Sequence, residues 1–72
     1  MKKIKKIKIR LNGKIKYVTQ ESKLSELLKH LKIPLNKVAI ELNKEIIDKK
    51  KINKLKLKKN DKIEIVHFIG GG

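Results

Sequence analysis

The first part of the chain alternates apolar and basic residues in two short runs. Within residues 4–11, one face carries Ile7, Ile9 and Leu11 and the other Lys6, Lys8 and Arg10, which is the pattern of a strand with one buried face. Asn12 and Gly13 follow and favour a tight hairpin, because both residue types tolerate positive φ. We therefore expect a second strand, from about residue 14 to residue 19, antiparallel to the first.

The length of this turn decides which side chains of the second strand face the core, because a shift of one residue reverses all of them. A two-residue turn places Lys16 and Val18 on the buried face and turns Ile15 and Tyr17 outward; a three-residue loop does the reverse. The chemistry of the Asn-Gly pair favours the two-residue turn. Lys16 would then reach solvent from the margin of the sheet through its long side chain, and Ile15 and Tyr17 would form an apolar spot on the open face.

The hydrophobic period changes from two to 3.6 between residues 22 and 32, which predicts an amphipathic helix. Ser22 is expected as its N-cap, and Pro34 ends it. His30 lies off the apolar stripe and is predicted to be a solvated surface residue. The stripe that should cover the sheet consists of Leu24, Leu27, Leu28 and Leu31.

The remaining chain predicts one strand, a short return strand and a surface connection. Residues 38–42 alternate, with Val38, Ile40 and Leu42 directed inward. A turn at residues 43–44 leads to a short strand at Ile46 and Ile47. The lysine-rich stretch 49–59 has the pattern of a surface connection with one helical turn at most, and its apolar anchors are Ile52, Leu55 and Leu57.

The last strand follows a turn at residues 60–61 and runs to Phe68. Its alternation places Ile63, Ile65 and His67 on one face and Val66 and Phe68 on the other. His67 is therefore predicted to be a partly buried structural histidine rather than a general base, since a base must reach the proton that it moves. Val66 and Phe68 are better candidates for a partner contact, because exposed apolar residues beside a terminus often mark one.

This order of elements predicts an α+β roll. A mixed sheet of four to five strands is covered on one face by one main helix, and its other face stays open. With 72 residues the chain has room for one small domain, which we expect at residues 1–69. Gly70, Gly71 and Gly72 would form a flexible tail, since glycine has no Cβ and retains the most backbone freedom.

Composition narrows the possible chemistry. The chain has no cysteine and only two, isolated histidines, so thiolate chemistry and a metal site are not expected. No apolar run approaches the roughly 20 residues of a membrane span and no signal peptide is recognisable; the expected location is the cytoplasm. An enzyme is the least expected class, because no nucleophile, base and pocket are suggested together.

The net charge of +14 raises the possibility of a nucleic-acid-associated module. Arg10 is the one arginine among 21 basic residues, and Tyr17 and Phe68 are the two aromatic residues. Guanine recognition and base stacking therefore have few suitable side chains. Weak, salt-sensitive association without sequence preference is the most that this composition predicts.

A tail of three glycines is either a frayed end or linker remnant, or a reacting group. A backbone without side chains can enter a narrow channel in a partner and bring its terminal carboxylate to a reactive phosphate. In that case Gly72 carries the chemistry, and Gly70 and Gly71 thread the channel.

Three stretches resemble the ThiS family of sulfur carriers, which have the β-grasp, ubiquitin-like fold. They are LNGK at residues 11–14, VAIELNKEII at 38–47 and, most specifically, DKIEIVHFIGGG at 61–72. The resemblance spans nearly the whole chain. The sequence departs from the family at Lys44, where glycine is frequent, and in its basic charge.

The resemblance implies a carrier without a cofactor of its own. An adenylating, E1-like partner would use ATP and magnesium to activate Gly72, and sulfur from a cysteine desulfurase would convert the acyl-adenylate to a thiocarboxylate. Thiazole synthase would receive that sulfur for thiamine. Ile15, Tyr17, Val66 and Phe68 are the candidate partner contacts. Carriers for molybdopterin synthesis or tRNA thiolation share these features and stay open as alternatives.

Overall fold

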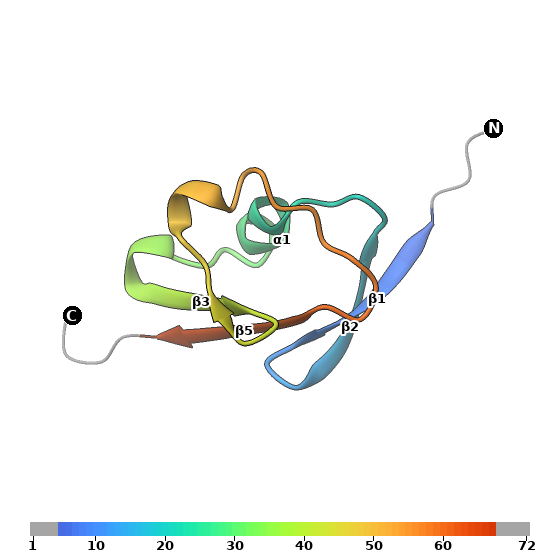
Figure 1. The fold of residues 1–72 in the computed structure, drawn as a ribbon, viewed down its shortest axis with the longest axis horizontal. Helices are drawn as coiled ribbons and strands as arrows, with labels where there is room; N and C mark the ends of the chain where they lie inside the picture. Colours follow the sequence, from blue (N-terminus) through green and yellow to red (C-terminus); the bar gives the residue numbers. More distant parts are fainter. Residues whose placement is uncertain (1–4, 68–72) are drawn as a thin grey trace.

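The computed structural model describes residues 5–67, which form a five-stranded mixed sheet with one α-helix on one face (Figure 1). The strands lie in the order β2-β1-β5-β3-β4, with β1 and β5 parallel and the other neighbours antiparallel. The elements in chain order are β1 (Lys6–Leu11), β2 (Lys14–Thr19), α1 (Leu24–His30), the 3₁₀ turn η1 (Leu35–Lys37), β3 (Val38–Leu42), β4 (Glu45–Ile46), the 3₁₀ turn η2 (Lys49–Lys51) and β5 (Lys62–His67). This is the predicted β-grasp arrangement.

The first hairpin has the two-residue turn that its sequence predicts. Leu11 lies opposite Lys14, and Asn12 and Gly13 between them have φ values of 49° and 81°. The resulting register leaves the side chains of Ile15 and Tyr17 exposed, at 53% and 62%. Lys16 and Val18 are half-buried on the helix side, so the predicted faces of both strands are confirmed.

The helix begins later than predicted, and the expected N-cap at Ser22 is wrong. Lys23 is the N-cap residue; its side chain has no acceptor, and its own N–H donates to the Glu26 carboxylate at 3.2 Å. The first helical N–H groups donate instead to the following connection, from Leu24 to the Leu55 carbonyl at 2.8 Å and from Ser25 to the Ile52 carbonyl at 3.2 Å. A tertiary contact thus satisfies the donors that a serine cap would otherwise serve.

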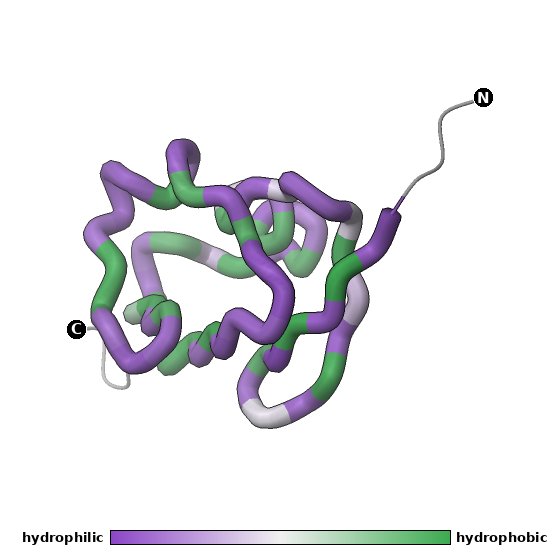
Figure 2. The backbone as a smooth tube through the Cα atoms, turned by 45° about the vertical axis from the view of Figure 1, so that its right-hand side comes forward, coloured by the Kyte–Doolittle hydropathy of each residue, from purple (hydrophilic) through white to green (hydrophobic). Residues whose placement is uncertain are grey.

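The core lies between α1 and the inward face of the sheet. Figure 2 shows the alternation of apolar and polar residues along the strands that creates this face. The connection between β4 and β5 closes the core through Ile52 and Leu57, each 3% exposed, as its sequence predicts. The other buried apolar residues are Ile9, Leu24, Leu27, Leu28, Val38, Ile40, Ile63 and Ile65. No helix within residues 5–67 is long and apolar enough to cross a membrane.

The turn between β3 and β4 contains a strained lysine. Asn43 and Lys44 have φ values of 53° and 72°, the left-handed region that asparagine tolerates and that costs a residue with a longer side chain roughly 1 kcal/mol. Glycine has no Cβ to oppose this conformation.

We therefore expect Lys44→Gly to stabilise the domain by about 0.5–1 kcal/mol. This corresponds to a rise of several degrees in the thermal midpoint of so small a domain. Lys44→Ala removes the same charge but keeps the Cβ, and should leave the midpoint nearly unchanged. Equal stabilisation by both variants in a thermal melt would attribute the gain to charge and contradict the strain argument.

Candidate functional site

The candidate site is the end of β5, where the chain leaves the middle of the sheet. β5 is the middle strand of five, with β1 on one side and β3 on the other. The described part of the chain ends with this strand at His67. Phe68, Gly70, Gly71 and Gly72 lie outside the described residues, so their predicted roles are judged from the sequence and the strand that leads to them.

The side chain of Asn12 extends the pairing of β1 beyond the point where that strand turns away. Regular pairing of β1 with β5 ends at Leu11 and Ile63. The Asn12 N–H then donates to the Ile63 carbonyl at 2.9 Å. Its side-chain Oδ1 accepts from the Ile65 N–H at 2.7 Å, and its Nδ2 lies 3.4 Å from the Ile65 carbonyl oxygen. One amide side chain thus occupies the place of a further strand residue.

Asn43 fixes the other end of β5 from the opposite side. Its N–H donates to the Lys62 carbonyl at 2.7 Å, and its Oδ1 accepts from the Lys62 N–H at 2.9 Å. Its Nδ2 also donates to the carboxylate of Asp61, which accepts from the Lys58 N–H at 2.7 Å as well; Asp61 as a whole is 8% exposed. Both asparagines are predicted from the sequence only as turn residues. A single sequence predicts that an asparagine lies in a left-handed turn, but it does not predict which groups the side-chain amide will contact.

The open face of the sheet carries the predicted apolar residues, but in two separate places. Ile15 and Tyr17 are exposed on β2, and Val66 is 50% exposed on β5. Strand pairing places Arg10 beside Ile15, and Lys62 at the start of β5 beside Arg10, so basic residues lie between the apolar residues of β2 and Val66 near the end of β5. The candidate contacts described by the structure therefore share a face without forming one continuous patch.

One apolar residue of this face is not among those that the sequence predicts. Ile46 is 78% exposed, and its pairing opposite Glu41 in β3 places it on the open side. The short-strand prediction for this segment was confirmed, but two consecutive isoleucines gave no alternation from which to tell the outward one. Ile46 and Val66 both lie on the half of the open face that contains β3, β4 and the end of β5.

The prediction that His67 is partly buried is wrong: its side chain is exposed. His67 does lie on the same side of β5 as Ile63 and Ile65, and it pairs with Val38. However, β1 has already left the sheet at this level, so β5 has a neighbour on one side only. Alternation along a strand predicts on which side of the sheet a residue lies, but the neighbouring elements determine whether its side chain is buried. His30 is exposed, as predicted.

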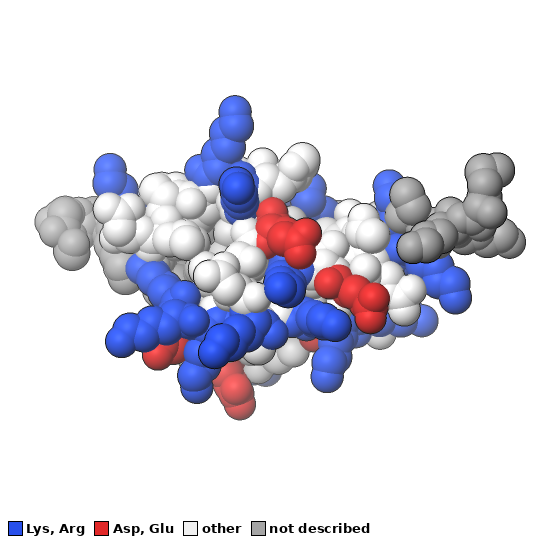
Figure 3. Space-filling model, turned by 90° about the horizontal axis from the view of Figure 1, so that it is seen from above, with Lys and Arg blue, Asp and Glu red and all other residues white. Residues whose placement is uncertain are grey.

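Charged residues are distributed widely over the surface. Figure 3 shows lysine and arginine around the visible outline, with aspartate and glutamate among them. Among residues 5–67, Lys56 Nζ and Glu21 Oε1 form an ion pair at 3.9 Å, and both side chains are largely exposed. Within the same range no group of three or more histidine, aspartate or glutamate residues is placed to hold a metal ion.

The chain belongs to the ThiS family, whose model matches residues 9–72. It is 40% identical over 65 residues to the sulfur carrier protein ThiS of Bacillus subtilis, covering 89% of this chain and 98% of the relative. The crystal structure of the thiamine biosynthesis protein ThiS from Geobacter metallireducens superposes with a TM-score of 0.80, at 30% identity, over 92% of this chain and all of that one.

A second kind of relative is much longer. The thiazole synthase of Magnetococcus marinus is 39% identical over 66 residues, which are 92% of this chain but 20% of that protein. The thiazole synthase of Paramagnetospirillum magneticum is 36% identical, again over 20% of its length. A segment similar to this chain is thus one part of each of these two proteins.

Asn12→Gly should loosen the end of β5 selectively. The variant keeps a residue suited to positive φ but removes the amide, with a loss of about 1–2 kcal/mol for the two side-chain hydrogen bonds. Hydrogen exchange should then accelerate at the Ile65 amide more than at Ile40 in β3. The matched variant Asn43→Gly should expose the Lys62 amide instead. Unchanged protection of Ile65 in Asn12→Gly would contradict the role given to this side chain.

Proposed function

We propose that this protein is a sulfur carrier for formation of the thiazole ring in thiamine biosynthesis, and that Gly72 is its sulfur-bearing residue. The observation that carries the proposal is that the central strand β5 ends at His67, with two residues between it and the sequence Gly70-Gly71-Gly72, in a chain of the ThiS family. A firmly held strand gives a partner a rigid body to bind, and glycines without side chains can enter a narrow channel. The chain is therefore a carrier and not the catalyst.

The proposed chemistry activates a carboxylate that is otherwise a poor electrophile. In an adenylating partner, a carboxylate oxygen of Gly72 attacks the α-phosphorus of ATP and pyrophosphate leaves. Sulfur from a cysteine desulfurase, delivered as a persulfide, then attacks the carbonyl carbon and displaces AMP. Reductive cleavage of the resulting sulfur–sulfur bond by a thiol leaves a thiocarboxylate. ATP and magnesium belong to the partner, so the carrier needs no phosphate loop or metal ligands of its own.

Thiazole synthase is the proposed acceptor of this sulfur. Support comes from the two thiazole synthases that contain a segment similar to this chain. Covalent linkage holds a carrier and an acceptor at high effective concentration, and it is useful only where the two act together. We expect the ATP-dependent activation and the transfer of sulfur to this acceptor to take place in the cytoplasm.

The open face of the sheet is the proposed contact with the activating partner. Val66 and Phe68 stand shortly before the glycine tail in the sequence, and Val66 is half exposed on this face. Ile15 and Tyr17 supply a second contact on β2, on the other side of the basic residues. Exposed apolar side chains at two places favour a broad partner surface that covers the sheet, because isolated contacts would bury little area.

Val66→Asp should lower kcat/KM for activation by about tenfold or more, since it places a charge in an apolar contact beside the tail. Its stability should change by no more than about 0.5 kcal/mol, because the position is half exposed. Asn53→Asp adds the same charge on an exposed loop near α1 and should leave activation unchanged. Normal activation of folded Val66→Asp would remove this residue from the proposed contact.

Blocking the terminal carboxylate should abolish sulfur loading. Protein that carries one added alanine after Gly72, or an amidated Gly72, should accept neither AMP nor sulfur in the presence of the activating partner, ATP and a sulfur donor. Thermal stability should be unchanged, because the change lies beyond the last strand. Mass spectrometry should find native-ended protein heavier by the replacement of one oxygen with sulfur, and fragmentation should place the sulfur on Gly72. Sulfur on the extended protein without cleavage of the alanine would contradict the mechanism.

A further inference from the structure

β2 forms one edge of the sheet, and a groove of about 460 Å³ opens between this edge and α1. The opposite edge strand, β4, has two residues, whereas β2 has six. β2 is therefore the longer free edge that the described part of the chain offers to another extended chain. This groove lies on the helix side of β2, away from the open face assigned above to the activating partner.

The backbone N–H and carbonyl groups of alternate residues in β2 point away from β1, toward the side where another strand would pair. Gln20 N–H donates to the Lys5 carbonyl at 2.7 Å, and bonded and non-bonded pairs alternate along an antiparallel ladder. The backbone groups of Ile15, Tyr17 and Thr19 consequently point away from β1. The Thr19 carbonyl accepts from the Ser22 N–H at 3.1 Å, which leaves the groups of Ile15 and Tyr17 for an incoming strand.

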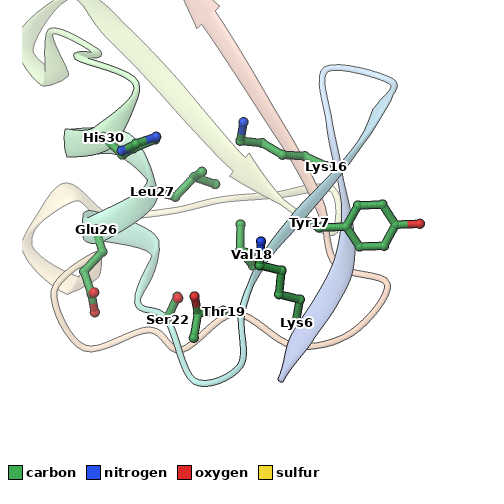
Figure 4. Close-up of a pocket in the computed structure, with 9 residues that line it drawn as sticks. All are labelled: Lys6, Lys16, Tyr17, Val18, Thr19, Ser22, Glu26, Leu27 and His30. Carbon is green, nitrogen blue, oxygen red and sulfur yellow. The ribbon is translucent and has the colours of Figure 1, made fainter. Parts of the chain in front are cut away.

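The groove beside this edge has an apolar floor and a basic end. Val18 is half-buried and Leu27 is 5% exposed. Figure 4 shows the Lys16 amine and the His30 ring directed toward the same end of the groove, while the Tyr17 ring points away from α1. The one acidic side chain of the lining, Glu26, lies apart from this basic end in Figure 4, and its carboxylate accepts from the Lys23 N–H.

We propose that the β2 edge and this groove bind an extended acidic segment of a partner protein by strand addition. Main-chain hydrogen bonds to Ile15 and Tyr17 would supply affinity, and alternate side chains of the segment would enter the groove. An apolar one covers Val18 and Leu27, and a carboxylate meets Lys16 and His30. The site does not depend on Gly72 or on sulfur transfer.

The positive charge of the β2 edge favours an acidic segment over a second copy of this chain as the strand that binds there. A second copy of this chain would bring its own edge lysines, including Lys14 and Lys16, against the same residues, and each copy carries a net charge of +14. Lysines on a free edge oppose pairing between copies, and the same positive potential favours an acidic strand. An acidic segment is thus complementary where a second copy is repelled.

The test uses a synthetic octapeptide in which valine alternates with glutamate and aspartate. Nuclear magnetic resonance titration of the whole protein should shift the amide signals of β2 and of Leu27, and hydrogen exchange at the Ile15 and Tyr17 amides should slow in the complex. Two control peptides should bind at least about tenfold more weakly. In one, glutamine and asparagine replace the acids; in the other, a central proline interrupts backbone pairing.

Lys16→Glu should weaken binding of the acidic peptide by about tenfold or more, whereas Lys29→Glu, which makes the same charge change on α1 outside this groove, should not. Activation of Gly72 by the adenylating partner should stay unchanged in Lys16→Glu, which separates this site from the proposed function. The proposal is overturned if the proline and neutral peptides bind equally well, if both lysine variants lose binding equally, or if the β2 amides do not respond. Edge-to-edge dimers without peptide would identify a second copy as the occupant and would also overturn it.

Discussion

The position of β5 in the middle of the sheet is the constraint on which the rest of this small structure depends. The strand that leads to the C-terminus is paired on both sides, in parallel with β1 and antiparallel with β3. Its inward residues Ile63 and Ile65 are 1% and 8% exposed. Removing this strand would divide the sheet into two hairpins and open the core. The tail therefore follows a central strand, whose first residues are paired on both sides, rather than an edge strand.

Hydrogen bonds from two turns support this strand where the sheet is incomplete. Asn12 extends the pairing of β1 to Ile65, and Asn43 connects Lys62 with the buried Asp61 carboxylate. Each asparagine also adopts the positive φ that its own turn requires. One residue thus closes a hairpin and holds the neighbouring strand, which suits a domain with room for only a small core.

Sequence patterns predicted those parts of the structure that local chemistry determines. The Asn-Gly turn set the first register, and alternation gave the correct side for every residue of β3. Patterns failed where a distant segment decides the outcome. The helix begins after Lys23 because the connection between β4 and β5 satisfies its first N–H groups. His67 is exposed because β1 ends before it, and the groove beside β2 exists only once α1 lies across the sheet.

The most direct test of the carrier account follows a labelled sulfur atom. Protein loaded at Gly72 with an isotopically labelled sulfur is purified and given to thiazole synthase with its other substrates in a single turnover, with unlabelled sulfide in excess. The account predicts one labelled thiazole for each loaded carrier and recovery of Gly72 as an ordinary carboxylate. Thiazole that contains only unlabelled sulfur, with the label still on the carrier, would contradict it.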